Sequence, residues 1–397
     1  MFNTIRLHRF FSFRESEIYC EAGVNLFVGI NGSGKSNLIR AIKFVKEAAS
    51  SVGLKKLVLD QWGGFDNIFH YGTDSSEVRL SFEINQAIAS EYGYYFTHPI
   101  FYDITICRLA NTTNYYLKEK LYQPKQNQQP FIFLEFNNGN GVLFEQSTAG
   151  NKGQLIRYND FDGQESALGK VYDSDRYKAV DAIRKMLNDI TVYDYFDTTP
   201  ASKLRKPVLP SSENKLLSDG SNLAQILNLL KIQDKVTDRA IRKSLNRINP
   251  AFRDYDFNFI GGNIEMMLSE EHLNRSIHTS HISDGTLRFL CLLVILLNPK
   301  RGKLICIDEP ELGLHPDMLL GLSEAIEAAA LNTQLFVATH SEHILNNFPL
   351  ASLRVLEKDN SNSTVSKSYT ESDFEGWYEN YLAGTMWRQG DLGGNRY

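Results

Sequence analysis

The chain has 397 residues, of which 42% are hydrophobic and 22% charged, as in an ordinary folded globular protein. These values exclude intrinsic disorder and fibrous repeats, and the length predicts two or three domains or one domain with large insertions. Lys and Arg number 42 against 47 Asp and Glu, a net charge of −5, so contact with nucleic acid would need a local basic patch.

The cysteines and the apolar segments indicate a cytoplasmic protein without a membrane span. Cys20, Cys107, Cys291 and Cys306 form no CxxC pair, which favours a reducing compartment. Polar and charged residues interrupt the first residues of the chain, where a signal peptide would be apolar. The longest apolar run, 289–297, is about half of the roughly 20 residues that cross a bilayer, so we expect a buried helix there.

The N-terminal part of the chain predicts strands, one helix and then a sheet of a different kind. We expect strands at residues 4–13 and 18–28, then a glycine-rich turn and a helix at 36–50. From about residue 75 to 165, alternating and aromatic-rich runs separated by turn residues predict an antiparallel sheet. This sheet would be an insertion.

Helices and buried strands follow. Apolar periodicity predicts helices at 180–187, 222–230 and 235–248. A linker at 198–218, rich in Lys, Pro and Ser, interrupts them, and we expect it to be mobile. Beyond residue 282, helices and short apolar strands alternate, as in a parallel sheet that is buried on both faces. The helices are predicted at 287–297 and 318–330, and the strands at 304–307 and 335–338.

Residues 29–36, with the sequence GINGSGKS, match the phosphate-binding loop pattern GxxxxGK[ST]. The loop lies between a predicted strand and a predicted helix, as this motif requires. Its glycines let backbone N–H groups face the phosphates, while Lys35 reaches the β and γ oxygens and Ser36 ligates Mg²⁺. We therefore expect nucleotide contacts from Gly29, Asn31, Gly32, Ser33, Gly34, Lys35, Ser36 and Asn37.

A second motif supplies adjacent acids. Residues 304–307 form an apolar run that ends in Asp308 and Glu309, the pattern of a Walker B strand. Asp308 would hold the magnesium ion, and Glu309 would orient and deprotonate the attacking water. Both motifs would end parallel strands at the carboxyl edge of one sheet, where open α/β folds bind ligands.

Two further elements could either contact the nucleotide or have a purely structural role. Ser283, Asp284 and Gly285 open a predicted helix and would form a second anion site, or they are an ordinary helix cap. His340 follows the strand 335–338, where its imidazole could contact a γ-phosphate or could be purely structural.

The order of these motifs resembles the ABC-type ATPase heads of the RecF and SMC group. Within that group, residues 283–289, 308–316 and 386–395 resemble a bacterial family of RecF-like "AAA family" ATPases of the AAA_21 type. The resemblance implies an α/β P-loop NTPase that uses ATP and Mg²⁺. It would have a lobe I with the antiparallel insertion (1–165), a helical insertion (166–280) and a lobe II with the signature, Walker B and tail (281–397).

The resemblance also implies a homodimer in which two heads sandwich two ATP molecules. Ser283 and Gly285 would then bind the γ-phosphate held by Lys35 of the other chain. His340 would be the switch histidine, and residues 313–315 would lie in the D-loop at the interface. The family's magnesium-sensing glutamine has one candidate, Gln61, and its arginine after the first strand could be Arg9 or Arg14.

The resemblance leaves the biological task open between DNA repair and anti-phage defence. In the second case the chain would be a sensor or scaffold for a separately encoded nuclease or toxin. A membrane transporter ATPase is disfavoured, because Asp284 replaces the first glycine of the transporter signature. A basic stripe, which is either a DNA contact or a solvated surface, comprises Lys203, Arg205, Lys206, Arg239, Arg242, Lys243 and Arg247. Aromatic tail residues predicted to clamp the core or an interface are Trp377, Tyr378, Tyr381 and Trp387.

Overall fold

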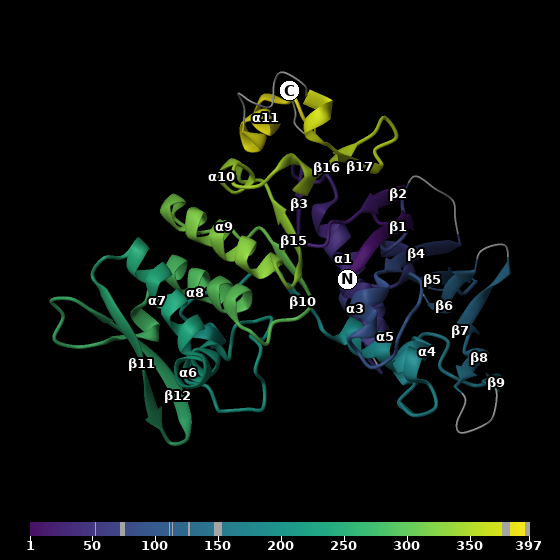
Figure 1. The fold of residues 1–397 in the computed structure, drawn as a ribbon, viewed down its shortest axis with the longest axis horizontal. Coiled ribbons are helices and arrows are strands. Elements are labelled where there is room, and N and C mark those ends of the chain that lie inside the picture. Colours follow the sequence, from purple (N-terminus) through teal and green to yellow (C-terminus); the bar gives the residue numbers. More distant parts are fainter. Residues whose placement is uncertain are drawn as a thin grey trace.

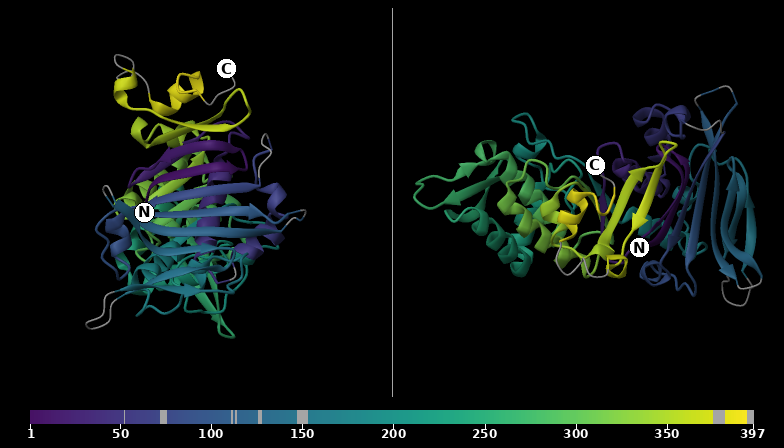
Figure 2. Two further views of the ribbon diagram at one scale, coloured as in Figure 1. Left: turned by 90° about the vertical axis from the view of Figure 1, so that its right-hand side faces the viewer. Right: turned by 90° about the horizontal axis from the view of Figure 1, so that it is seen from above.

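The computed structural model describes residues 1–51, 53–71, 76–110, 112, 114–125, 128–146, 153–374 and 382–393. Three sheets organise these residues (Figure 1). A central, mostly parallel sheet lies between an antiparallel sheet on one side and a helical lobe on the other, and Figure 2 shows this arrangement from above. The mixed α/β architecture confirms the predicted fold class.

The central sheet has six strands in the order β10-β14-β15-β3-β16-β17. Only β17 is antiparallel to its neighbour. The strands are β3 (Val24–Val28), β10 (Ile190–Tyr193), β14 (Leu304–Asp308), β15 (Gln334–Thr339), β16 (Leu353–Lys358) and β17 (Thr364–Ser368). The glycine-rich loop therefore follows a strand in the middle of the sheet, and β15 separates that strand from the one that ends in Asp308.

The antiparallel sheet has eight strands in the order β2-β1-β4-β5-β6-β7-β8-β9. Its strands are β1 (Phe2–Phe10), β2 (Phe13–Tyr19), β4 (Glu77–Ile84), β5 (Ile100–Arg108), β6 (Tyr115–Lys125), β7 (Gln128–Asn137), β8 (Asn140–Glu145) and β9 (Gln154–Tyr158). A third, small sheet holds β11 (Phe252–Ile260), β12 (Asn263–Glu270) and β13 (Ile277–His278).

Helices connect and cover the sheets. The described helices are α1 (Lys35–Ala48), α2 (Gly53–Lys55), α3 (Gln86–Ser90), α4 (Ala167–Lys170), α5 (Lys178–Asn188), α6 (Leu223–Gln233), α7 (Lys235–Ile248), α8 (Asp284–Leu297), α9 (Pro316–Ala330), α10 (Glu342–Leu345) and α11 (Ala383–Gln389). Short helical turns are η1 (Lys56–Gln61), η2 (Phe65–Asn67), η3 (Lys203–Arg205), η4 (Thr279–His281), η5 (Leu350–Ser352) and η6 (Glu371–Phe374). Several begin as their sequences dictate: the Asp234 side chain caps α7, and Pro316 opens α9.

The central strands divide the core into two halves. On β14, Leu304 and Cys306 face a cluster that contains α1, α5 and the antiparallel sheet. Ile305 and Ile307 face the opposite cluster, which contains α8 and α9. The strand is buried on both faces, which is why its sequence is continuously apolar.

Three details differ from the sequence-based expectations. Three strands, β1, β2 and β3, stand where two were predicted at residues 4–13 and 18–28. The chain turns sharply after Phe10, where Arg9 and Phe11 take positive φ. The predicted helical insertion at 166–280 also contains strands, and one of them, β10, belongs to the central sheet. Thr198–Ser218, expected to be a mobile linker, is anchored through Arg205, whose side chain is 7% exposed.

The tail and the apolar helix bear on two further expectations. Trp387 on α11 is buried against the α8–α9 side of the core, as predicted for a clamp. Trp377, Tyr378 and Tyr381 lie outside the described residues. In the described ranges, every helix is too short or too polar to cross a bilayer.

Candidate active site

The glycine-rich loop is shaped by close packing against the C-terminal strands. A side chain at Gly29 would place its Cβ 2.3 Å from the Leu356 carbonyl oxygen. Gly34 has a φ of 114° and lies against Thr364, whose hydroxyl donates to the Ser33 carbonyl at 2.7 Å. Only glycine combines this backbone conformation with such close approach, so the motif's glycines here have a direct steric reason.

Lys35 opens α1 and folds over the loop. Its Nζ donates to the carbonyl oxygens of Gly29 at 2.6 Å and Ile30 at 3.3 Å. Burial lowers the pKa of the Lys35 ammonium, while the carboxylates of Glu309 and Asp308 oppose that shift. A buried cation facing acids at the mouth of a glycine-rich loop is suited to hold a polyphosphate.

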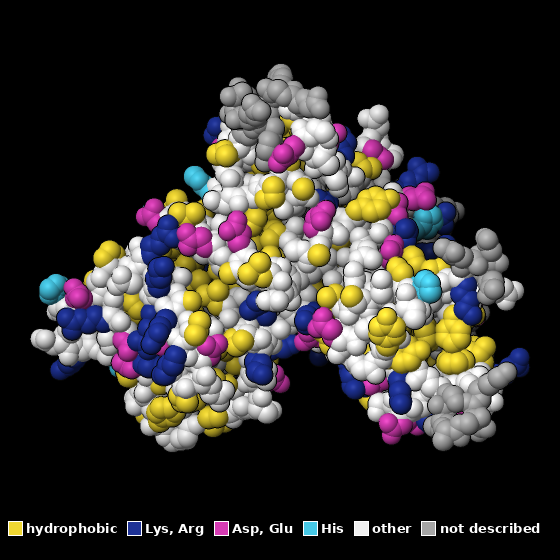
Figure 3. All heavy atoms as spheres, in the orientation of Figure 1, with side chains coloured by type: hydrophobic (Ala, Val, Ile, Leu, Met, Phe, Trp, Pro, Cys, Tyr) yellow, Lys and Arg dark blue, Asp and Glu magenta, His cyan; other side chains and the backbone are white. Residues whose placement is uncertain are grey.

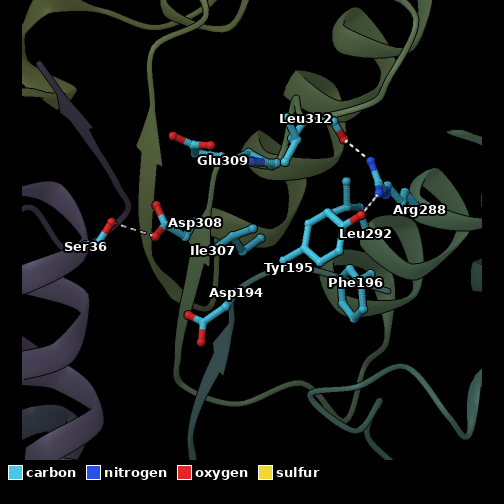
Figure 4. Close-up of a pocket in the computed structure, with 11 residues that line it drawn as sticks. Ser36, Asp194, Tyr195, Phe196, Arg288, Leu292, Ile307, Asp308, Glu309 and Leu312 are labelled. Atoms are coloured by element: carbon cyan, nitrogen blue, oxygen red, sulfur yellow. Dashed lines mark hydrogen bonds between the residues drawn. The ribbon is translucent and has the colours of Figure 1, made fainter. Parts of the chain in front are cut away.

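Ser36 and Asp308 join the two predicted motifs. The Ser36 hydroxyl donates to Asp308 Oδ2 at 3.0 Å, as Figure 4 shows. Burial raises the pKa of Asp308, and the hydrogen bond from Ser36 partly offsets this effect. The other oxygen, Oδ1, is buried and has no hydrogen-bond partner among the described residues. A hydroxyl beside a carboxylate with a free oxygen fits Mg²⁺, which takes oxygen ligands and uses few carboxylates.

Glu309 and His340 meet at the ends of neighbouring strands. Glu309 takes a φ of 47°, and its N–H donates to the Ala338 carbonyl at 2.8 Å. Its Oε1 lies 3.5 Å from His340 Nδ1. The sheet thus brings the predicted base and the predicted switch histidine together, because β14 and β15 are neighbours and β15 lies next to β3, the strand before the glycine-rich loop.

Other side chains in the cleft did not stand out in the sequence. The cleft that contains Ser36, Asp308 and Glu309 is also lined by Asp194, Tyr195 and Arg288 (Figure 4). Asp194 directly follows β10, a strand of four residues that was too short to recognise. Its place beside β14 gives it the same strand-end position as Asp308.

Arg288 bridges this cleft to the loop before α9. Its guanidinium donates to the Tyr195 hydroxyl and, at 3.1 Å, to the Leu312 carbonyl oxygen. It also lies over the Tyr195 ring, 4.6 Å from the ring centre. This bridge could not be predicted from the sequence, because Tyr195 and Leu312 are distant from Arg288 along the chain.

Ser283 and Gly285 lie elsewhere. Ser283 caps α8 by accepting from Thr286 N–H at 3.2 Å, and it lines a groove between α7 and β12 rather than the cleft of Ser36. Gly285 packs under the Gly313 carbonyl, which a Cβ would approach to 3.1 Å. Within one chain, the structure therefore does not bring the signature residues to the glycine-rich loop.

Arg205 anchors the signature residues. It donates to the carbonyl oxygens of Thr279 and Ile282, each at 2.8 Å, and to Asp284 at 2.5 Å. A basic residue predicted for a DNA-binding stripe is thus committed to the protein's own backbone. Of the two alternatives left open for the basic stripe, a DNA contact and a solvated surface, neither fits Arg205, whose side chain is 7% exposed.

Of the remaining predicted residues, some lie at the glycine-rich loop and others lie away from the cleft. Asn37 borders the loop and donates to the Ser12 hydroxyl at 2.9 Å, whereas Asn31 is exposed at the loop's tip. Gln61 is exposed at the end of η1 and does not line the cleft. Arg9 and Arg14 flank the β1–β2 turn and do not line the cleft either.

The basic stripe on α7 is partly neutralised. Lys and Arg side chains gather over α7 on the face shown in Figure 3. Arg242 pairs with Asp238 at 3.0 Å, and Arg247 pairs with Glu324 at 2.7 Å. Arg239 and Lys243 are exposed and make no ion pair with a described residue.

The chain is similar in sequence to known proteins. The family model described as "AAA domain, putative AbiEii toxin, Type IV TA system" matches residues 24–346, and the chain belongs to this family. A stretch of 40 residues is 48% identical to the DNA double-strand break repair Rad50 ATPase of Thermoplasma volcanium and 55% identical to that of Thermoplasma acidophilum. Each match covers 10% of this chain and 4% of the relative.

Solved structures extend the likeness to the whole fold. An Smc head bound to the C-terminal winged-helix domain of ScpA superposes with a TM-score of 0.56 at 13% identity, covering 94% of this chain and 99% of that one. The Smc head with an extended coiled coil from Pyrococcus furiosus gives 0.54 at 12% identity, covering 94% and 97%. The chain therefore has the fold of an SMC head and belongs to a family of AAA-domain ATPases.

Proposed function

We propose that ATP closes two copies of this chain into a head-to-tail dimer with two composite sites. Each site would take Lys35, Ser36, Asp308, Glu309 and His340 from one chain and the signature residues from the other. The separation of Ser283 from the Walker cleft within one chain is the observation that supports this proposal. A symmetric head-to-tail arrangement would complete both sites at once.

The residues of the cleft divide the chemistry between them. Ser36 and Asp308 would hold Mg²⁺, which supplies positive charge to the phosphate oxygens. Lys35 would bind the same phosphates, and Glu309 would orient the attacking water and accept its proton. His340, between the Walker strands, would contact the terminal phosphate.

Glu309→Gln tests the proposed base and the proposed dimer together. Without the carboxylate, we expect hydrolysis to fall by about 100-fold or more while nucleotide binding persists. Light scattering in ATP should then show a stable doubling of mass. Glu327→Gln, an exposed substitution on α9, serves as the control. Normal hydrolysis by Glu309→Gln would exclude this residue as the base.

We further propose that the dimer acts on DNA. Both curated relatives are named as DNA double-strand break repair ATPases, and Arg239 and Lys243 leave positive charge exposed on α7. If these residues bind phosphates, the double variant Arg239→Ala/Lys243→Ala should reduce the salt dependence of DNA affinity by about two units of slope. DNA-independent ATPase activity and no measurable DNA affinity at low salt would exclude this task.

A second candidate task is anti-phage defence. The family description names a toxin and a toxin–antitoxin system, which favours a sensor or scaffold that works with a separately encoded nuclease or toxin. Copurification of a tagged Glu309→Gln chain in ATP, compared with Lys35→Ala, would test it. A nuclease or toxin retained only by the Glu309→Gln chain would support this alternative, whereas an equal set of proteins on both would exclude an ATP-dependent partner.

A further inference from the structure

Glu311 lies in the segment between β14 and α9, yet its side chain turns back to the end of β15. Its Oε1 accepts from the Thr339 hydroxyl at 2.7 Å and from the His340 N–H at 3.0 Å. The side chain is only 10% exposed. These two hydrogen bonds tie the segment that follows the Walker B acids to the backbone that carries the histidine.

The imidazole of His340 faces two carboxylates. Its Nδ1 lies 3.5 Å from Glu309 Oε1 and 3.6 Å from Glu311 Oε1. The Nδ1 side of the ring therefore faces two hydrogen-bond acceptors. The same carboxylate therefore holds the backbone of His340 and faces its ring.

The segment that carries Glu311 is itself braced. The Leu314 N–H donates to the Glu311 carbonyl at 3.0 Å, and the Leu312 N–H donates to the Glu309 carbonyl at 3.0 Å. Arg288 on α8 donates to the Leu312 carbonyl oxygen. A displacement of this segment would move the Glu311 carboxylate and, through it, the end of β15.

We propose that Glu311 is a positioning residue that holds His340 beside Glu309 and couples its placement to the segment before α9. The Glu311 carboxylate is long enough to accept hydrogen bonds from the end of β15, and it acts through these bonds rather than by contacting the nucleotide. This inference rests on the proposed roles of Glu309 and His340. It adds a residue that the motif patterns did not single out for any role.

Three substitutions of Glu311 distinguish the length of its side chain from its negative charge. Glu311→Ala removes both hydrogen bonds, and Glu311→Asp withdraws the carboxylate by one methylene group. For both we expect kcat to fall about tenfold or more with KM changed less than about twofold, because orienting contacts typically have effects of this size. Glu311→Gln keeps an acceptor at full reach and should restore most of kcat. Glu327→Gln, at an exposed position of α9, is the matched control.

A double-mutant cycle with His340→Ala tests the route of the effect. If Glu311 acts through the histidine, Glu311→Ala should lower kcat less than about twofold in the His340→Ala background. An equal loss in both backgrounds, or a loss expressed only in KM, would overturn the proposal. If Glu311→Ala does not fold, as judged by circular dichroism, Glu311→Asp takes its place in the cycle. Full activity of Lys35→Ala would instead show that the proposed active site itself is wrong.

Discussion

The Walker cleft and the signature loop (residues 283–286) are held in place by different means. In the cleft, Asp308, Glu309 and His340 follow adjacent parallel strands, so the backbone ladder of the sheet sets their positions. The signature loop has no such ladder: Arg205 reaches it from η3, and Arg288 on its own helix α8 reaches out to Tyr195 and to the Leu312 carbonyl oxygen. The difference teaches that the sheet backbone positions the cleft residues, whereas side-chain contacts position the signature loop.

The largest effect should come from the cleft. Lys35→Ala removes the ammonium that folds over the loop, so we expect nucleotide binding to be lost and hydrolysis to fall by about 100-fold or more. Fluorescence titration with a labelled ATP analogue and a phosphate-release assay would measure the two losses. Lys43→Ala on the same helix should leave both unchanged.

Complementation between the two regions gives the next largest effect. Ser283→Arg should keep nucleotide binding but block the composite site, so each of Lys35→Ala and Ser283→Arg alone should be inactive. Their equimolar mixture should regain up to about a quarter of wild-type hydrolysis, because half of randomly formed dimers would hold one intact site of two. A mixture as inactive as its components would mean that the two motifs do not cooperate between chains.

A smaller effect is expected from the anchor of the signature loop. Arg205→Ala deletes hydrogen bonds from a guanidinium that is 7% exposed, and we expect unfolding free energy to fall by about 2–3 kcal/mol. Hydrolysis should fall while nucleotide binding to the cleft is retained, as measured by chemical denaturation and the same titration. Lys203→Ala, whose side chain is 76% exposed, is the control. Loss of nucleotide binding in Arg205→Ala would show that the two regions are not independent.

The smallest effect concerns stability and pH. Burial raises the pKa of Asp308, so the native protein holds this proton more tightly than the unfolded chain, and stability falls as pH rises through the native pKa. Asp308→Asn should therefore raise Tm slightly at pH 7 without Mg²⁺, and this gain should vanish below the ordinary pKa of 3.8. Asp317→Asn, 80% exposed, should change little. A lower Tm for Asp308→Asn at pH 7 would contradict the argument.

The sequence predicted the elements that depend on neighbouring residues, but not the contacts between residues that are distant along the chain. The glycine-rich loop, α1, β14 and α8 follow from contiguous residues, and the fold class and ATPase activity that the family resemblance implied are confirmed. Asp194 was missed because β10 has only four residues and becomes recognisable only beside β14. Arg205 was assigned to a surface stripe because a basic residue in a polar segment looks solvated until its distant carbonyl partners are known.

The glycine-rich loop packs against β16 and β17, which are synthesised near the end of the chain. β3 pairs with β15 on one side and β16 on the other, and Asn25 contacts Leu335 across 310 positions of sequence. At a synthesis rate of about 5–20 residues per second, roughly 15–60 s pass between the synthesis of β3 and that of its neighbours β15 and β16. Until then its apolar edges would be unpaired, so a growing chain of this protein is a natural client for a chaperone, and a fragment that ends before β16 would lack one wall of the nucleotide loop.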